Sequence, residues 1–328
     1  MLSIVIANFN EYKNLKKCLY FLNKQKNIKF EVIISEGKKD FKKIKKEYKF
    51  KLYQYYNKYP QNQEARKFLG YKRSRYKIIC FLDSDNFITE KKFLINHLDT
   101  FKFSKVGFAY CKYYKYIKKD NYLNKYFSLI GVNDPIAWYI KKNDRYEYMS
   151  DKKFSDTLTF QNNKFSILNF KSIKTTIGAN GFFIRKKILD KFNIKKPEDF
   201  LHIDTNIEAI LKSDYRHYAL VNASLWHHTA DNLFSNLRKR SLYFNNFYFP
   251  KLKKRTYKMF DLYKYSDILK LLMMFFSNIS LLLPLALSIK NFAKTKKREW
   301  LIHPFIMNIF IINYTITYLL TIVKNKIK

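Results

Sequence analysis

The chain has 328 residues, 47% of them hydrophobic and 19% aromatic, so it can bury a sizeable core and is not a disordered polymer. Its formal net charge of +38 favours a polyanionic partner, and nucleic acid and an anionic membrane surface are the two obvious candidates. Only three cysteines occur, without a spacing that suits zinc, which excludes a zinc module and indicates a reduced compartment.

Apolar runs typical of strands alternate with helical patterns over the first 82 residues. We predict strands at Ser3–Ala7, Glu31–Ser35, Lys51–Tyr56 and Lys77–Leu82, with helices near Glu11–Lys24, Phe41–Lys49 and Gln63–Arg75. Such alternation is what a mainly parallel sheet covered by helices requires. The continuous apolar run Ile78–Leu82 is typical of a strand that is buried on both faces. The sequence therefore predicts an α/β fold.

The pattern weakens between about Phe103 and Phe170, a stretch rich in Tyr, Lys and Asn that we expect to be irregular, with some strand and helix. Regular elements then return in the same alternation of strands and helices. We predict a strand at Gly178–Ile184, helices at Arg185–Phe192 and Asp199–Lys212, a strand at Tyr218–Trp226 and a basic helix at Asp231–Phe247.

Two long uncharged runs follow Pro250, at Leu271–Ile289 and Trp300–Val323. Each has about the 20 apolar residues that a helix needs to cross a bilayer. Each is also hydrophobic all round, whereas a core helix of a soluble domain, which is the alternative, is usually apolar on one face. We therefore expect a C-terminal hydrophobic helical hairpin attached to a membrane.

Basic residues precede the first run and fill the loop between the two: Lys251, Lys253, Lys254, Arg255, Lys290, Lys294, Lys296, Lys297 and Arg298. The positive-inside rule places both groups on the same side of a membrane. A hairpin that spans the bilayer would violate the rule for one group, whereas re-entrant or interfacial helices would not. Both arrangements stay open at this point.

Acidic and amide side chains follow three of the predicted strands. Asp83 and Asp85 end the most apolar strand, Glu36 ends the second, and Asn8 and Glu11 follow the first. The carboxyl ends of parallel strands meet at one edge, where ligands bind, and side chains at i and i+2 point the same way. Two carboxylates so placed suit Mg²⁺ or Mn²⁺ bridging the phosphates of a nucleotide. The alternative is a turn in which one of them caps the helix near Glu90.

These segments together resemble the family-two glycosyltransferases of GT-A fold. That family's first strand reads S-I-V-I-x-x-x-N, as Ser3–Asn10 does, and its second ends in an acid that holds the nucleobase, at the position that Glu36 takes here. An A-R-N-x-G helix resembles Ala65–Gly70, and F-L-D-x-D matches Phe81–Asp85. The resemblance covers residues 3 to about 240 and implies a Rossmann-like, mainly parallel sheet flanked by helices. Glu36 stands where the family usually has Asp, and Lys38 and Lys39 replace a Gly/Ser-rich turn.

The resemblance also implies residue roles on the donor side. The nucleotide-sugar-binding residues would be Ala7, Asn8, Asn10, Glu11, Glu36, Arg66, Asp83, Ser84 and Asp85. The metal, Mg²⁺ or Mn²⁺, would be bound by Asp83 and Asp85 together with His228 from Trp226–Thr229, which resembles the family's closing strand. A surface or capping role is the alternative for His228.

The acceptor side and the base follow from two further blocks. Gly178–Arg185 resembles a G-x-N-x-x-x-R block and gives Asn180 and Gly181. Ile203–Asn206 resembles an E-D-T-D segment and makes Asp204 the catalytic base, with Glu208 as a second candidate and a helix N-terminal acid as the alternative role of Asp204. Arg238 and Arg240 would bind phosphate, either in the diphosphate or in a lipid-linked acceptor, unless they rest on lipid headgroups.

We therefore expect a catalytic domain over residues 1–248, with a nucleotide-sugar-binding half (1–102) and an acceptor-binding half (103–248). A basic linker and two hydrophobic membrane helices would occupy residues 249–328. The expected function is inverting transfer of a sugar from a nucleotide diphosphate to a membrane-proximal glycan or lipid-linked acceptor. Because no signal peptide precedes Ser3, the catalytic part should lie on the cytoplasmic face.

The same residues bear on two rival functions. Nucleotidyl transfer would favour a glycine-rich phosphate loop, and residues 8–13 contain no glycine. A non-enzymatic basic protein that binds nucleic acid or an anionic membrane would account for the charge but not for carboxylates gathered at the sheet edge. We therefore expect membrane lipid, and not nucleic acid, as the polyanionic partner.

Overall fold

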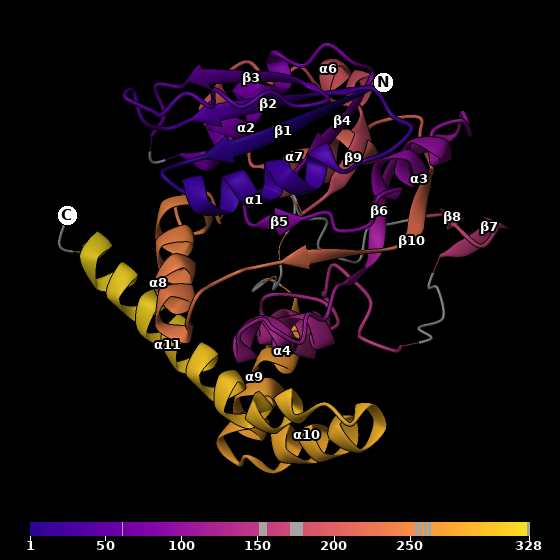
Figure 1. Ribbon diagram of the computed structural model, residues 1–328. Helices are drawn as coiled ribbons and strands as arrows, with labels where there is room; N and C mark the ends of the chain where they lie inside the picture. The colour runs from indigo at the N-terminus through magenta and orange to yellow at the C-terminus, as the bar shows by residue number, and fades with distance from the viewer. Residues whose placement is uncertain are drawn as a thin grey trace. The chain divides into compact units, whose positions relative to one another are not determined.

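The computed structural model of the chain describes residues 1–60, 62–150, 156–170, 180–252, 255, 258, 261 and 264–326. It divides the chain into two units (Figure 1). Unit 1 comprises Met1–Lys115 and Lys152–His227, and unit 2 comprises Tyr116–Asp151 and His228–Lys328. Residues 116–151 and 228–248 group with the C-terminal helices, and the catalytic domain over residues 1–248 stays a prediction.

The described residues of unit 1 form a ten-stranded sheet in the order β3-β2-β1-β4-β9-β6-β10-β8-β7, with β5 paired to β10. Its strands are β1 (Leu2–Asn8), β2 (Phe30–Glu36), β3 (Lys51–Tyr56), β4 (Ile78–Phe81), β5 (Asn86–Phe87), β6 (Val106–Tyr114), β7 (Thr157–Gln161), β8 (Phe165–Asn169), β9 (Phe182–Arg185) and β10 (His217–His227). The four strands β3-β2-β1-β4 are parallel. They confirm the predicted α/β class.

Parallel pairing brings the ends of these strands to one edge of the sheet. In β1, Asn8 lies opposite Glu36 of β2, and Glu36 lies opposite Tyr56 of β3. On the other side of β1, Val5 lies opposite Phe81, so the chain leaves β4 and enters Asp83–Asp85 at the same edge. The predicted gathering of polar residues therefore follows from the register.

Helices cover both faces of the sheet (Figure 1). They are α1 (Tyr12–Asn23), α2 (Gln63–Lys72), α3 (Phe93–Thr100), α6 (Lys186–Phe192), the 3-10 helix η1 (Pro197–Asp199) and α7 (His202–Leu211). The buried stripe of α1, which includes Leu15 and Leu19, shares a core with Ile4 and Ile6 of β1. On the opposite face, α2 packs on Val5, where a Cβ at Gly70 would lie 2.5 Å from a Val5 methyl carbon. Glycine therefore permits the close approach of α2 to the sheet.

One sequence prediction for unit 1, a helix, is wrong. The expected helix at Phe41–Lys49 is irregular, because its backbone N–H groups find side-chain acceptors elsewhere: Lys42 donates to Tyr12, Ile44 to Gln54 and Lys49 to Asn23. The stretch from Phe103 to Phe170 is more regular than we expected, since it contains β6, β7 and β8 as well as two helices of unit 2.

Unit 2 is helical in its described residues. Its elements are α4 (Tyr122–Ile130), α5 (Pro135–Tyr139), α8 (Leu233–Tyr243), the π-helix η2 (Phe244–Tyr248), α9 (Tyr265–Ile279), α10 (Leu282–Thr295), the 3-10 helix η4 (Arg298–Ile302) and α11 (His303–Lys326). Tyr126 and Phe127 of α4 share a core with Met307 and Phe310 of α11. The C-terminal segment is therefore packed into unit 2.

The two apolar runs differ in structure. The first is broken into α9 and α10, which meet at 81°, and the second continues through α11, drawn in yellow in Figure 1. By length and composition, one described segment, Arg298–Lys324, could cross a membrane, or two could if the bent pair counted as one span. Of the basic residues that precede the first run, Lys253 and Lys254 lie outside the described residues.

Candidate active site

A buried carboxylate marks the end of β2. Glu36 is fully buried and accepts hydrogen bonds from Asn8 Nδ2 at 2.8 Å and Gln54 Nε2 at 3.0 Å. Burial raises the pKa of Glu36 above its usual range, although these two donors and the guanidinium of Arg66 act in the opposite direction. The carboxylate is therefore held in a fixed orientation by amides from β1 and β3.

Arg66 of α2 lies beside this carboxylate. Its Nη1 donates to the carbonyls of Tyr59 and Pro60, and its guanidinium lies 5.6 Å from the ring centre of Phe9. Burial lowers the pKa of Arg66 to about 10. A Cβ at Gly37 would lie 2.6 Å from the Phe9 ring and 2.9 Å from Arg66 Nη1, so the backbone comes very close to both.

Two buried polar atoms in this group lack a hydrogen-bond partner among the described residues, namely Asn8 Oδ1 and Arg66 Nε. Unpaired buried donors and acceptors are uncommon in proteins and indicate a ligand or water. An acid, an aromatic ring and a planar cation placed together suit a nucleobase, which offers both hydrogen-bonding edges and a π-face.

Asp83, the first acid after β4, forms an ion pair with a lysine. Lys67 of α2 is fully buried, and its Nζ lies 3.0 Å from Asp83 Oδ1. Burial alone would raise the pKa of Asp83, but Lys67, and then His202 and His227, outweigh it and hold that pKa below its usual value. The ends of α2, α7 and β10 therefore act on this carboxylate together.

A second buried pair joins α2 to α7. Glu64 Oε2 accepts hydrogen bonds from the backbone N–H of His202 at 2.7 Å and from its ring Nδ1 at 2.5 Å. Burial opposes ionisation of Glu64, but the charges of His202 and Lys67 prevail and lower its pKa. Glu64 thus fixes the start of the helix that carries Asp204.

Replacing this carboxylate should change both stability and its dependence on acid. We expect Glu64→Gln to lose about 3 kcal/mol of unfolding free energy at pH 7, since it removes one partner of a buried pair. Because the folded-state pKa of Glu64 is lowered, its contribution is full above the ordinary Glu pKa of about 4.3 and disappears as the pH falls through the folded-state value. Urea unfolding between pH 7 and pH 2 should therefore show a difference in unfolding free energy between parent and variant that is constant down to about pH 4.3 and decreases below it.

The control for that experiment is Glu208→Gln, since Glu208 pairs with Lys212 at 2.7 Å on the exposed side of α7. It should cost less than about 1 kcal/mol. A difference in unfolding free energy between parent and Glu64→Gln that stays constant from pH 7 to pH 2 would contradict the assignment.

Asp85, the second acid, lies in an amide-rich environment. Its Oδ1 accepts from Asn86 Nδ2 at 2.8 Å and lies 3.8 Å from Nε2 of His227. Asn86 Nδ2 also donates to Asn180 Oδ1, and Asn180 Nδ2 donates to the hydroxyl of Tyr114, at 3.1 and 2.9 Å. Asn180 therefore links the acids after β4 to β6.

Gly181 follows Asn180 with a φ of +71°, which is the left-handed region that favours glycine. Its N–H donates to the carbonyl of Phe81 at 3.0 Å, which fixes the entry into β9. Gly178 and Ala179, the first residues of the predicted acceptor block, lie outside the described residues. At the entry to β9, Asn180 is thus bonded to Asn86 and Gly181 to Phe81, on either side of the two acids that follow β4.

The described residues fit a divalent cation that shares its coordination with a substrate. Among them, no group of three His, Cys, Asp or Glu side chains gathers to form a complete protein cage. Asp85 and His227 do lie together, and the buried Asn86 Oδ1 beside them has no hydrogen-bond partner in the described part of the chain. Mg²⁺ and Mn²⁺ in nucleotide enzymes typically take one or two protein ligands, with phosphate oxygens and water completing the shell.

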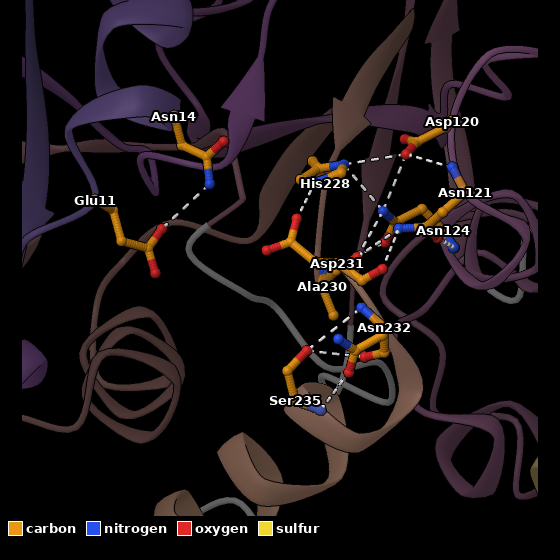
Figure 2. Close-up of polar contacts among 10 residues, drawn as sticks. All are labelled: Glu11, Asn14, Asp120, Asn121, Asn124, His228, Ala230, Asp231, Asn232 and Ser235. Atoms are coloured by element: carbon orange, nitrogen blue, oxygen red, sulfur yellow. Dashed lines mark hydrogen bonds and ion pairs between the residues drawn. The ribbon is translucent and has the colours of Figure 1, made fainter.

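His228 has other partners, all within unit 2 (Figure 2). Its Nδ1 lies 3.1 Å from Asp120 Oδ1, and its Nε2 lies 3.1 Å from Asp231 Oδ1. Asn124 Nδ2, which donates to Asp120 Oδ1, lies 3.0 Å from Nδ1 of His228. The hydrogen bond to Asp120, and then that to Asp231, raise the pKa of His228 against the effect of burial. The geometry therefore favours the neighbouring His227, and not His228, as the histidine beside Asp85.

Asp204 lies in the first turn of α7 and is buried, with 7% of its surface exposed. Glu208 is one turn further on and is paired with Lys212. Since Glu64 and His202 anchor the start of α7 near Lys67 and Asp83, the fold brings Asp204 to the same end of the sheet as the other acids. Its own role as a base stays a prediction.

The remaining predicted residues fall into two groups. Glu11 is exposed; its carboxylate accepts from Asn14 at 3.4 Å (Figure 2) and from Ser84 at 3.5 Å. Ala7 is half-buried, and Asn10 is exposed with a φ of +64°. In unit 2, Arg238 is exposed, whereas Arg240 donates to the backbone carbonyl of Asn133 at 2.7 Å. Arg240 thus has a structural partner within unit 2.

A parallel sheet flanked by helices, with acids and amides at its carboxyl edge, defines the class of α/β proteins that bind ligands at that edge. The family model described as Glycosyl transferase family 2 matches residues 3–190. The chain therefore belongs to glycosyl transferase family 2, and its fold is GT-A.

One solved structure supports the fold. The mannosyltransferase PcManGT from Pyrobaculum calidifontis, in complex with GDP-Man and Mn²⁺, is 8% identical, with a TM-score of 0.51 over 97% of this chain and 86% of that one. TarS from S. aureus is 13% identical, with a TM-score of 0.45, and the match covers 79% of this chain and 40% of TarS. No curated protein matches the chain in sequence.

Several residues of the site were missed in the sequence: Phe9, Gln54, Glu64, Lys67, Asn86, Tyr114 and His227. For Glu64 and Lys67, the sequence did contain a signal. Glu64 and Lys67 are three residues apart on the helix that carries Arg66, so the two lie on one face. Lys67 also stands where the family motif has an amide.

Proposed function

We propose that the protein transfers a sugar, with inversion, from a nucleoside diphosphate sugar to a membrane-proximal glycan or lipid-linked acceptor. Family membership supports glycosyl transfer. The observation that carries the donor class is the arrangement of the parallel strand ends. Glu36, Arg66 and Phe9 form a base-sized group beside β1 and β2, and Asp83 and Asp85 follow the neighbouring strand β4.

The two ends of such a donor need different partners. Glu36 and Arg66 would hold the nucleobase, and Asn8 would lie between base and ribose. Asp85 and His227 would hold Mg²⁺ or Mn²⁺ against the diphosphate. When bound, the cation would supply Lewis-acid stabilisation of the leaving diphosphate. Asp83, paired with Lys67, would orient donor hydroxyls through its remaining oxygen.

The proposed chemistry is a single displacement. Asp204 accepts the proton of the acceptor hydroxyl while that oxygen bonds to the anomeric carbon, and the bond from the anomeric carbon to the diphosphate breaks. One displacement inverts the anomeric centre, whereas retention by two displacements would need a carboxylate nucleophile. Asn180 and Gly181 would line the acceptor side.

A thermal-shift screen tests the donor and the metal together. A panel of nucleoside diphosphate sugars, including UDP-GlcNAc and GDP-Man, is added with and without Mn²⁺, since only a ligand that prefers the folded state raises the melting temperature. We expect one nucleotide class to stabilise the protein and Mn²⁺ to increase the shift. A panel without any stabilising member would contradict the proposed donor class.

The matched variants are Asp85→Asn and Asp99→Asn. Asp85→Asn should lose the Mn²⁺-dependent part of the shift, because a neutral amide is a poor ligand for a hard cation. Asp99→Asn should keep it, since Asp99 pairs only with the exposed Lys102 across one helical turn. An unchanged Mn²⁺ effect in Asp85→Asn would overturn the metal assignment.

A further inference from the structure

The break between α9 and α10 forms an apolar apex on unit 2. Leu281 at the break has a φ of +58°, which is unfavourable for leucine, and the two helices diverge by 81°. Phe276, Ile279 and Leu282 are 66%, 61% and 73% exposed there, and Leu281, Leu283 and Leu285 are exposed beside them. Single exposed leucines are ordinary, but a contiguous group of this size marks an interaction surface.

Neither helix of the pair is long enough to cross a bilayer. α9 has 15 residues and α10 has 14. At 1.5 Å per residue each is roughly 22 Å long, against a hydrocarbon core of about 30 Å. A bent pair of this size reaches into one leaflet and returns.

Exposed cations lie at both outer ends of the pair. Lys264 and Lys270 are at the start of α9, and Lys290, Lys294, Lys296 and Arg298 are at the end of α10 and just beyond it. Cations next to inserted apolar segments are attracted to anionic headgroups, and both ends therefore favour the same side. The charge pattern agrees with a hairpin that enters and leaves through one surface.

The long helix α11 is not free to act as an isolated span. Asn313, Thr317 and Thr321 form a polar stripe at helical spacing. Ser241 Oγ lies 2.8 Å from Thr317 Oγ1 and 3.3 Å from Asn313 Oδ1, and Thr321 Oγ1 donates to Asn245 Oδ1 at 2.6 Å. This half of α11 is therefore hydrogen-bonded along α8 and η2.

The helix bonded to α11 is basic. α8 carries Arg238, Lys239 and Arg240, and the first two are exposed. A transmembrane α11 would carry these cations toward the hydrocarbon, where charged side chains are strongly disfavoured. On its other face α11 exposes an apolar stripe made of Ile312, Ile316, Leu319, Leu320 and Val323. A stripe of this kind suits a helix that lies in the plane of a membrane surface.

We propose that unit 2 binds one leaflet of an anionic bilayer without crossing it. The α9–α10 apex inserts as a re-entrant hairpin, and α11 lies in the interface with its polar stripe on α8. The proposal rests on the membrane-proximal part of the proposed function and determines its topology: both ends of α11 face the same compartment.

Cysteine labelling tests this topology in the full chain, since Cys18, Cys80 and Cys111 are all buried and give little background. Ser280→Cys, Lys296→Cys and Lys324→Cys are treated with a membrane-impermeant maleimide in intact cells and in inverted membrane vesicles. We expect Lys296→Cys and Lys324→Cys to be labelled in inverted vesicles alone, and Ser280→Cys only after detergent. Labelling of Lys324→Cys or Ser280→Cys in intact cells would mean a true span and would overturn the proposal.

Insertion is measured separately by sedimentation with vesicles of phosphatidylglycerol or phosphatidylcholine. Leu282→Asp should lower the partition onto phosphatidylglycerol vesicles about tenfold, as expected for a charge placed in the hydrocarbon region. The control Leu211→Asp, at a 41% exposed leucine of unit 1, should bind like the parent. Parent-like binding by Leu282→Asp would contradict insertion. Neither measurement uses a sugar donor or sugar transfer. The membrane result can therefore be interpreted even if the transferase assignment fails, and the transferase result can be interpreted even if the membrane proposal fails.

Discussion

Asp204→Asn should reduce sugar transfer by a factor of about 10² to 10⁴ and leave donor binding unchanged. The reason is that general-base catalysis contributes a factor of this size, while a base toward the acceptor makes no essential contact with the nucleotide. Asparagine keeps the shape of the side chain at this buried position in α7 but takes no proton. Transfer is measured as labelled sugar incorporated into membranes of cells that produce the protein, with the donor found by thermal shift.

The matched variant is Glu208→Gln, which removes the other carboxylate of α7. Its carboxylate is held by Lys212 in an exposed pair, so transfer should remain near the parent rate. Parent-like transfer by Asp204→Asn would show that the base is wrongly assigned, and a loss confined to Glu208→Gln would move the role to that residue.

Asp83→Asn should destabilise the fold by about 3 kcal/mol, because it leaves the ammonium of Lys67 buried without its carboxylate. The double variant Asp83→Asn with Lys67→Met should recover most of that loss, since it removes the stranded charge as well. Lys67→Met alone should cost less than Asp83→Asn, because the Asp83 side chain is 29% exposed and can be solvated. Urea unfolding of the parent, both single variants and the double variant gives the interaction energy.

The exposed pair of Asp99 and Lys102 provides the reference, and Asp99→Asn should cost less than about 1 kcal/mol. Equal losses for Asp83→Asn and Asp99→Asn would mean that the buried pair does not hold α2 to the end of β4. A double variant no more stable than Asp83→Asn would lead to the same conclusion.

Much of the fold was predictable because the central strand β4 is apolar on both faces. Ile78–Leu82 could be identified without any partner, and the parallel order then brought Glu36 and Asp83 to one edge. The helix predicted at Phe41–Lys49 failed because long-range acceptors such as Tyr12 and Asn23 take its N–H groups. Local propensity carries no information about such partners.

The choice between His227 and His228 could not be made from the sequence. Side chains of a strand alternate between faces, so a register shift of one residue exchanges the two. β10 has such an irregularity between Val221 and Ser224, and only its pairing with β5 fixes His227 opposite Asn86. The pairing of Lys67 with Asp83 could not be predicted either, because it depends on how closely α2 packs against the sheet and not on the local sequence.

That close packing has a consequence for how donor preference can evolve. The missing side chain at Gly70 lets α2 rest on Val5, and the same helix places Arg66 beside Phe9 and Lys67 beside Asp83. Any lateral movement of α2 would shift the contacts of Arg66 and Lys67 at once. If the proposed donor site is right, a substitution on α2 that changes the preference for the nucleobase will also change the environment of Asp83.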